Sequence, residues 1–406
     1  MFEHEALYTH RGEKNLTDVQ LKALQLFYKE KDFPYYSLVH NGVRFCEYVG
    51  VLKVNNLTIE ILPKADKSSN HNHWRNLLID MMRSIGLLKP DAPTHANLKL
   101  KQSSILDMYL ELFISEVEKL IRQGLIKKYR NIESNYTALK GKLLVAKQVT
   151  KNSVHQERFY IQHSVYDQNH LLHEILYLAM HTILKLGTAP HLISRYHNAL
   201  LYFPDQKTIK IKEEIFNKIK LTRKTAAYQS ALDIAKIILL NYHPDMDNGS
   251  NNVLALMFDM NMLWEKFVLK SLQRNIHKDM QVTGQISIDF WMAENRYTKR
   301  IKPDIVISHN NKPVAVLDTK WKNISDGTPS DDDLRQLYAY SKYHNNVPSY
   351  LVYPGEENKI IKGLYAKAFE DDSETPGGLM KIKIGSGKSD GMQLLHQQII
   401  NNLTLY

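Results

Sequence analysis

The order of apolar and polar positions divides the chain into three regions with different periodicities. Residues 1–95 combine one helical stretch with short β-type segments, residues 96–250 follow mostly a helical period, and residues 251–406 alternate between strands and helices. Because one core rarely extends over more than roughly 200 residues, this succession predicts an α+β protein with several domains. We expect a β-rich N-terminal domain, a mostly helical middle region and a C-terminal α/β domain.

Two stretches carry clear helical signatures. Thr17 and Gln20 have the spacing of a capping box at the start of TDVQLKALQLFYKEKD, which predicts a helix that ends near Lys29. In the middle region, LDMYLELFISEVEKLIRQGLIKKY places apolar residues on one face at helical spacing. The residues of this stripe are Leu106, Leu110, Phe113, Val117, Leu120 and Ile121.

Turn-forming residues mark the expected hairpins and loops. Asn41-Gly42 and Asn55-Asn56 separate β-type segments in the N-terminal region, as turns do between antiparallel strands. The polar tract KADKSSNHNH, residues 64–73, is predicted to be a loop. Gly141 and scattered β-branched residues predict a short hairpin insertion near residues 131–165, within the helical middle region.

The C-terminal region shows the order helix, strands, helix, strand of an α/β domain. The segments are MFDMNMLWEKFVLKSLQRNI (257–276), QISIDFWM (285–292), RIKPDIVIS (300–308), KPVAVLDTKWK (312–322), DDDLRQLYAYSKYH (331–344) and SYLVYP (349–354). We expect RIKPDIVIS and KPVAVLDTKWK to pair as a hairpin, because the link between them is short and turn-like.

Asp304, Asp318 and Lys320 are the candidate catalytic residues of this hairpin. Asp318 and Lys320 share one face of a buried strand, because strand side chains alternate with a period of two. Asp304 follows Pro303 at the start of the preceding strand, so pairing would bring two carboxylates and an ammonium group together. Hard carboxylate oxygens bind Mg²⁺, and a metal with an adjacent cation suits phosphodiester hydrolysis. The pattern predicts a Mg²⁺ site on Asp304 and Asp318; an ordinary ion pair at a strand end is the alternative.

The helix before these strands contains a further candidate acid. Glu265 falls at helical spacing among Met262, Leu269 and Leu272, which are expected to be buried. A carboxylate there is unfavourable unless it has a partner, so Glu265 is a candidate for contact with the metal or its water. The alternative is a partly exposed glutamate paired with Lys266.

The helix after the strands offers an amide and a phenol. Gln336 and Tyr340 are one turn apart and share a face that could hold a phosphate or Lys320, with core packing as the alternative. Asp331–Asp333 are interpreted as charges in the first turn, which interact favourably with the helix dipole. This acidic run is therefore left outside the predicted site.

Charge and cysteine content narrow the class of protein. The 406 residues have a formal net charge of +10, which favours a polyanionic partner such as nucleic acid. The single cysteine, Cys46, excludes an internal disulfide and fits a reducing compartment. The N-terminus MFEHEALYTH lacks the features of a signal peptide, and no apolar run is long enough to cross a bilayer. We expect a cytoplasmic protein without a membrane partner.

These motifs resemble a known nuclease family. The arrangement of Asp304, Asp318 and Lys320 resembles a PD-(D/E)xK motif. The sequence around these residues is similar to that of McrC, the nuclease subunit of McrBC modification-dependent restriction systems. The similar segments are IEILPK (59–64), LKGKL (139–143), YDQNHLLHEIL (166–176), FDMNMLWEKFV (258–268), KPDIVI (302–307), VLDTKWK (316–322) and QLYAYSKYH (336–344). The resemblance therefore extends over nearly the whole chain.

The resemblance implies a fold, a reaction and a set of site residues. The C-terminal domain would have the restriction-endonuclease-like fold and cleave double-stranded DNA with a modified base, of the 5-methylcytosine type. The metal-binding acids would be Asp304 and Asp318, the catalytic lysine Lys320, and the helix acid Glu265. Gln336, from the helix pattern above, completes the candidate catalytic set.

The resemblance also implies a partner that binds the nucleotide. In this family the partner is a hexameric AAA+ GTPase of the McrB type, and residues 1–95 would dock on it and stimulate GTP hydrolysis. The chain itself is not expected to bind GTP, because IGSGKS at 384–389 lacks the first glycine of a phosphate-binding loop, where Ile382 stands. Double-strand cleavage would require two nuclease subunits to meet on DNA.

Two other readings of the sequence stay open. One is a stand-alone PD-(D/E)xK nuclease that acts in DNA repair or RNA processing, which a neighbouring gene for an AAA+ GTPase would argue against. The other is a non-enzymatic DNA-docking adaptor, which the intact Asp304, Asp318 and Lys320 argue against and a failure to bind metal would favour.

Overall fold

The computed structural model describes residues 1–12, 14–30, 35–54, 57–64, 70–87, 104–243, 253–275, 279–294, 298–322, 328–355, 357–366, 374–384 and 399–400. The chain forms several sheets and helices in two units, as expected for a mixed α/β protein with more than one domain. The first unit comprises residues 1–52, 59–91 and 257–406, and the second comprises residues 53–58 and 92–256. The division into three domains at residues 95 and 250 stays a prediction.

The first unit begins with a capped helix and a small antiparallel sheet. Helix α1 (Asp18–Glu30) starts with the predicted capping box: the Thr17 amide donates to Gln20 Oε1 at 2.8 Å, and the Gln20 amide donates to Thr17 Oγ1 at 3.3 Å. The sheet has the order β1-β3-β2, and Asn41 forms the predicted turn with a positive φ of 55°. Its strands are β1 (Ala6–Tyr8), β2 (Tyr36–Val39) and β3 (Gly42–Phe45).

A four-stranded sheet follows, in the order β5-β4-β10-β9. Its strands are β4 (Tyr48–Val54), β5 (Leu57–Ile61), β9 (Tyr242–His243) and β10 (Val253–Asp259). Strand β4 is buried along almost its whole length, which its run of β-branched and aliphatic residues favours. The turn predicted at Asn55-Asn56 lies outside the described residues.

Helix α2 (His71–Ser84) begins within the tract that was predicted to be a loop. The Asn70 side chain accepts hydrogen bonds from the amides of Asn72 and His73 at 3.1 and 3.2 Å, so it caps the helix. The prediction was wrong for residues 71–73 because the first turn has no apolar residue before Trp74, and the helical period is therefore not visible there.

The second unit is mainly helical, as predicted. In α4 (Ile105–Gln123), which Ser104 caps, the expected stripe is buried except for Ile121, which is half-buried. Outside the insertion treated next, the other described helices of this unit are α6 (Leu171–Leu186), α7 (Pro190–Leu201), α8 (Glu213–Asn217), the 3₁₀ helix η1 (Ala226–Tyr228) and α9 (Gln229–Leu240).

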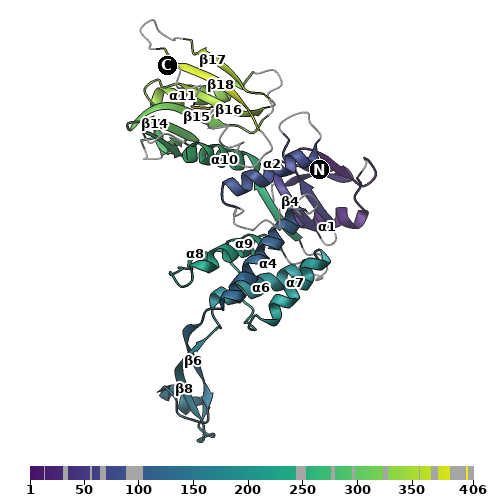
Figure 1. Cartoon of the computed structure of the whole chain (residues 1–406), viewed down its shortest axis with the longest axis vertical. Coiled ribbons are helices and arrows are strands. Elements are labelled where there is room, and N and C mark those ends of the chain that lie inside the picture. Colours follow the sequence, from purple (N-terminus) through teal and green to yellow (C-terminus); the bar gives the residue numbers. More distant parts are fainter. Residues whose placement is uncertain are drawn as a thin grey trace. The chain divides into compact units, whose positions relative to one another are not determined.

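The predicted insertion is a β-ribbon, hereafter the arm (residues 128–167). It contains β6 (Lys128–Tyr136), β7 (Lys142–Leu143), α5 (Val145–Lys151) and β8 (Phe159–Asp167), with the sheet order β6-β8-β7 (Figure 1). Gly141 has a φ of 88°, and a Cβ there would lie 2.5 Å from the carbonyl oxygen of Gln162. Only glycine therefore allows β7 to lie this close to β8.

A buried polar cluster joins the arm to its helices, and we call it the arm root. His173 Nδ1 lies 2.6 Å from the carbonyl oxygen of Gln168, and its Nε2 lies 2.9 Å from Tyr228 Oη. Because a carbonyl only accepts, Nδ1 is the donor and Nε2 accepts from Tyr228. Tyr228 Oη also accepts from the amide of Ile126 at 3.1 Å, and His170 Nε2 lies 3.2 Å from the Ile126 carbonyl oxygen.

The C-terminal part of the first unit contains a six-stranded mixed sheet, in the order β11-β14-β15-β16-β18-β17. Helix α10 packs on β11 and β15, and α11 packs on β15, β16 and β18 (Figure 1). The helices are α10 (Met260–Asn275) and α11 (Asp331–Tyr343). The strands are β11 (Met280–Gly284), β14 (Ile305–His309), β15 (Lys312–Thr319), β16 (Ser349–Gly355), β17 (Lys359–Leu364) and β18 (Pro376–Lys383).

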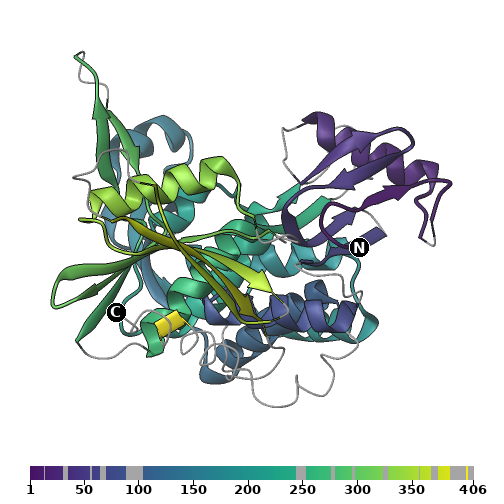
Figure 2. The ribbon, with the colours of Figure 1, turned by 90° about the horizontal axis from the view of Figure 1, so that it is seen from above.

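The segment RIKPDIVIS is two strands, which corrects the prediction of one. Its start lies in β13 (Thr298–Ile301), which among the described strands pairs with β12 (Ile288–Met292) alone, and its end is β14. Pro303 interrupts the ladder because it has no amide to donate. Strands β12 and β13 form a separate ribbon that projects from the six-stranded sheet (Figure 2).

Three further points of the sequence analysis concern unpredicted strands, membrane-spanning helices and the IGSGKS segment. Strands β11, β17 and β18 were not predicted; each of them contains glycine, which weakens a strand pattern. Across the described part of the chain, no helix is long and apolar enough to cross a membrane. Most of the IGSGKS segment lies outside the described residues.

Candidate active site

The hairpin of β14 and β15 brings the two predicted acids together. The turn at Asn310 and Asn311, both with positive φ, pairs Ile305 with Leu317. Continuing this antiparallel register by one residue places Asp304 opposite Asp318, where side chains on neighbouring strands are in contact range. The hydrophobic pattern therefore determines which carboxylates meet, because a slip of one residue would expose the buried face.

Asp304 is fixed by the residue that follows Asp318. Its Oδ2 accepts a hydrogen bond from the Thr319 amide at 2.7 Å and another from Thr319 Oγ1 at 2.8 Å. These two bonds orient the carboxylate across the hairpin. Thr319 was not a predicted site residue, since its role depends on cross-strand geometry.

Asp318 is buried with an incompletely satisfied carboxylate. The residue is 2% exposed, and its Oδ2 forms an ion pair with the Lys320 ammonium at 2.9 Å but has no hydrogen-bond partner among the described residues. Burial, together with the charge of Asp304, raises the pKa of Asp318 to about 6, although Lys320 acts in the opposite direction. This oxygen could accept a further cation.

Lys320 lies among acids and one amide. Its Nζ is 2.9 Å from Asp318 Oδ2, 3.6 Å from Asp333 Oδ1 and 3.2 Å from Gln336 Oε1, to which it donates. Burial favours the neutral amine, but Asp318 and Asp333 outweigh that effect and raise the pKa of Lys320. The side chain is therefore a positively charged group held in position at the sheet edge.

Helix α11 supports this lysine through a chain of hydrogen bonds. Gln336 Nε2 donates to Tyr340 Oη at 2.6 Å, and Tyr340 Oη donates to the carbonyl oxygen of Lys302 at 3.1 Å. The structure thus brings Gln336 to Lys320, as expected, and Tyr340 ties α11 to the segment that leads into Asp304.

Glu265 reaches the same group of residues from α10. Its Oε1 accepts from Gln285 Nε2 at 2.6 Å, and Lys302 Nζ donates to Gln285 Oε1 at 2.7 Å. Burial and the charge of Asp304 raise the pKa of Glu265, against the influence of Gln285 and Lys302. Glu265 therefore lies within electrostatic range of the hairpin acids.

The ligand set fits a hard divalent cation. Among the described residues, no group of three His, Cys, Asp or Glu side chains has the arrangement of a metal site. Mg²⁺ needs only one or two carboxylates, because it keeps several waters in its coordination shell. Asp304 and Asp318 would supply these oxygens, and the unsatisfied Oδ2 of Asp318 is the group that a cation would satisfy.

Comparisons with known proteins identify the family. A family model described as "McrBC 5-methylcytosine restriction system component" matches residues 43–354, which is most of the chain. The chain belongs to this McrBC family. The predicted resemblance is confirmed at this level.

Solved structures support the fold of this McrBC component. A chain from the half-complex of the tetradecameric assembly of Thermococcus gammatolerans McrB AAA+ hexamers with bound McrC has a TM-score of 0.71 at 20% identity, over 99% of each chain. A chain of the Thermococcus gammatolerans McrBC complex has a TM-score of 0.50 at 21% identity, over 68% of this chain and 88% of that one. No curated protein matches.

Two details of the McrBC component differ from the sequence reading. Met262 was expected on the buried face of α10 but is 41% exposed; Leu263 and Trp264 are buried instead. The other two residues of the expected stripe fit better, because Leu272 is buried and Leu269 is half-buried. Asp333 was set aside as a first-turn charge, and it does lie in that turn, but it also contacts Lys320 and Lys322 at 3.6 and 3.5 Å.

Gln285 was also missed, and its backbone is unusual. Its φ of 54° lies in the left-handed region, which disfavours a residue with a side chain, and its amide donates to the carbonyl oxygen of Asp304 at 2.9 Å. Strained residues are often retained where they position functional groups. In the sequence, only its place just before a strand could have drawn attention to it.

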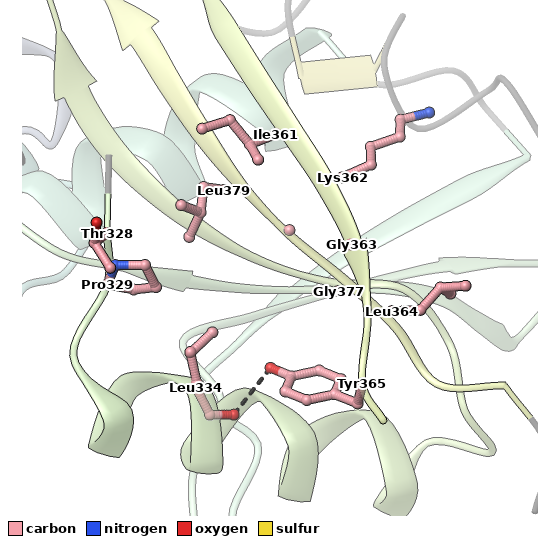
Figure 3. A pocket seen from close by; sticks show the side chains of 11 residues that line it. Thr328, Pro329, Leu334, Ile361, Lys362, Gly363, Leu364, Tyr365, Gly377 and Leu379 are labelled. Carbon is pink, nitrogen blue, oxygen red and sulfur yellow. Dashed lines mark hydrogen bonds between the residues drawn. The ribbon is translucent and has the colours of Figure 1, made fainter. Parts of the chain in front are cut away.

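A separate hollow of about 320 Å³ lies between β17, β18 and the start of α11 (Figure 3). Tyr365 Oη donates to the carbonyl oxygen of Leu334 at 2.9 Å, and a Cβ on Gly377 would lie 2.8 Å from the Tyr365 ring. The residues described around this hollow are mostly apolar and include no carboxylate. We therefore assign no chemistry to it.

Proposed function

We propose that this McrBC component is a Mg²⁺-dependent DNA endonuclease, the cleaving subunit of a GTP-dependent restriction system that acts on modified DNA of the 5-methylcytosine type. One observation carries the proposal: Asp304 faces Asp318 across a hairpin, and the Lys320 ammonium lies 2.9 Å from Asp318. Two carboxylates and a lysine at one sheet edge are the PD-(D/E)xK set.

Each residue of the set would have a distinct part in phosphodiester hydrolysis. Asp304 and Asp318 would hold Mg²⁺, which when bound polarises a phosphoryl oxygen and acidifies a water. Lys320, charged and oriented by Gln336, would stabilise the negative charge that develops on the phosphate. Glu265, held by Gln285, would orient a water at the edge of the site.

The proposed partner is a hexameric AAA+ GTPase of the McrB type, which would bind GTP. Support comes from the similarity to a chain of an assembly of McrB AAA+ hexamers with bound McrC. Residues 1–95 would dock on this partner and stimulate GTP hydrolysis. Both proteins would act in the cytoplasm on double-stranded DNA, and two nuclease subunits would meet there for double-strand cleavage.

The test is a cleavage assay of modified and unmodified duplex DNA with Mg²⁺, with and without the GTPase and GTP. We expect cleavage of modified DNA that depends on the partner and GTP. Asp318→Ala and Lys320→Ala should each reduce it by at least about 100-fold, the usual effect of removing one group that stabilises transition-state charge.

The matched control is Asp332→Ala, an exposed acid in the same helix turn as Asp333. It should leave cleavage unchanged. Full activity in the Asp318 and Lys320 variants would exclude this site. Cleavage by the wild-type protein without partner or GTP would favour the stand-alone nuclease in repair or RNA processing. A wild-type protein that neither binds metal nor cleaves DNA would favour a DNA-docking adaptor.

A further inference from the structure

The ribbon of β12 and β13 exposes a run of apolar side chains beside the active site. Phe290, Trp291 and Met292 are 47%, 54% and 66% exposed. Soluble proteins rarely leave several large apolar residues together in water unless a partner covers them. The same ribbon carries Lys299 and Arg300, which are also exposed.

A β-bulge determines which side chains share a face of the ribbon. The register passes from Asp289 opposite Arg300 to Trp291 opposite Lys299, so Phe290 has no partner on β13. Trp291 and Lys299 are therefore cross-strand neighbours on one face, and Asp289 and Arg300 bond to each other at 2.7 Å on the other. This pairing places the Trp291 ring next to the Lys299 ammonium group.

Helix α11 holds the ribbon relative to the catalytic residues. Tyr343 Oη donates to the carbonyl oxygen of Phe290 at 3.1 Å, and the two rings are 5.6 Å apart. One turn earlier, Tyr340 bonds the carbonyl oxygen of Lys302, and Gln336 bonds Lys320. One helix thus connects β12 and the residue that follows β13 to the lysine of the site.

We propose that the ribbon is a DNA-binding element that contacts the duplex next to the scissile phosphate. The inference rests on the proposed nuclease function. A two-stranded ribbon fits the major groove of DNA, and apolar side chains and lysines are the groups that contact sugars and phosphates without reading the sequence. The chain continues directly from β13 to Asp304, so a duplex bound by the ribbon would extend to the metal acids.

Charge favours DNA over a second copy of the chain as the occupant. Near Trp291 the ribbon and its connection to Asp304 carry Lys299, Arg300 and Lys302, against Asp289 and Glu294. In a two-fold dimer the same patch would meet itself, so cations would face cations. A phosphate backbone complements this excess of positive charge.

Trp291 also supplies the measurement. The chain has four tryptophans, and the other three, Trp74, Trp264 and Trp321, are buried at 2%, 0% and 7% exposure. Quenching of tryptophan emission by iodide therefore reports on Trp291. We would titrate the full-length protein with a short fluorescein-labelled duplex, with Ca²⁺ in place of Mg²⁺, and follow anisotropy and iodide quenching together.

The expected result is that the duplex binds and shields Trp291 from iodide. Trp291→Ala should weaken binding about five- to ten-fold, as loss of one aromatic contact does. Trp291→Phe should keep most of the affinity but lose the quenching signal. Lys299→Ala should lower the slope of log affinity against log salt concentration by about one. Tyr129→Ala, at an exposed aromatic on the arm, is the control and should change none of these.

Other outcomes would overturn the inference. Binding of DNA with Trp291 still open to iodide would place the duplex elsewhere, and no binding would exclude the ribbon as a DNA element. Shielding that rises with protein concentration without DNA would identify a second copy as the occupant. Cleavage is measured separately with Mg²⁺, so shielding by DNA in a protein that never cleaves would retain the ribbon and reject the nuclease.

Discussion

The candidate active site and the arm root are both buried polar clusters, but they are stabilised in different ways. At the site, Lys320 pairs with Asp318 and Asp333, and Asp318 Oδ2 has no hydrogen-bond donor among the residues that the structure describes. At the arm root, His173 uses both ring nitrogens in hydrogen bonds to Gln168 and Tyr228. The first cluster carries an excess of negative charge that a bound cation would balance, whereas the polar groups of the second satisfy one another by hydrogen bonds.

The difference also appears in how the two clusters titrate. Burial raises the pKa of Asp318 to about 6 and lowers the pKa of His173 to about 4. A folded state that favours protonated Asp318 loses stability as pH rises from about 4 to 6. A folded state that favours neutral His173 loses stability as pH falls from about 6.5 to 4. Burial thus disfavours the charged form at both clusters, but at pH 7 Asp318 is still mostly ionised whereas His173 is neutral.

The largest expected effect separates function from stability at the site. Asp318→Asn should reduce DNA cleavage at least about 1,000-fold, because it removes a metal ligand and the partner of Lys320. The same change should stabilise the metal-free protein by about 2 to 3 kcal/mol at pH 7, since a buried charge is removed. Cleavage rates and urea unfolding measure the two effects. A variant that is less stable but still active would show that Asp318 stabilises the fold and does not serve catalysis.

Mg²⁺ should stabilise the folded protein by binding at the charged cluster and not at the arm root. At a Mg²⁺ concentration about 100 times the dissociation constant, the gain in unfolding free energy should be about 2.7 kcal/mol. Because protons compete for Asp318, the gain should shrink as pH falls below about 6. Thermal unfolding with and without Mg²⁺ checks this, and Asp318→Asn should show little response. An equal response in the variant would argue for a metal elsewhere.

Acid should loosen the neutral cluster. Between pH 7 and 5, His173 alone should remove about 2 kcal/mol of local stability, because its proton must enter a site that favours the neutral ring. His173→Gln should lose much less over that range. Hydrogen exchange of α6 and α9 amides at both pH values measures the difference, with the exposed His10→Gln as the control. Equal acid sensitivity in wild type and His173→Gln would show that the cluster is not the acid-sensitive element.

The smallest effect concerns one hydroxyl group of the arm root. Tyr228→Phe should reduce the protection of the Ile126 amide by about 1 to 2 kcal/mol, since that amide and His173 Nε2 both lose their partner. Mg²⁺ stabilisation should be unchanged, because the substitution does not touch the site. Hydrogen exchange and thermal shift on the same preparation distinguish these outcomes. A fall in Mg²⁺ stabilisation would show that the two clusters are coupled.

The features that could be predicted from the sequence are those that depend on residues close together in the chain. The Thr17–Gln20 capping box, the Asn41 turn and the facing of Asp304 and Asp318 all follow from local chemistry or from a short link between two strands. The stripe of α4 followed from a strong helical period. Each of these features needs only a few consecutive residues to be recognised.

The missed features depend on residues far apart in the chain. Gln285 contacts Glu265 across 20 positions, and Asp333 reaches Lys320 only after α11 has packed on the sheet. The break between β13 and β14 arises because the two halves of one apolar pattern pair with different strands. No local periodicity encodes these choices, since they are made by tertiary packing.

The short connection between the ribbon and the sheet has a mechanical consequence. Only Lys302 and Pro303 separate β13 from Asp304, and the ring of Pro303 restricts rotation of the backbone between them. Such a short link, with one of its two residues restricted, would transmit much of a tilt of the ribbon to the Asp304 carboxylate. A molecule that binds the ribbon and tilts it would thereby shift Asp304 relative to Asp318. Contact at the ribbon would then change the distance between the two acids.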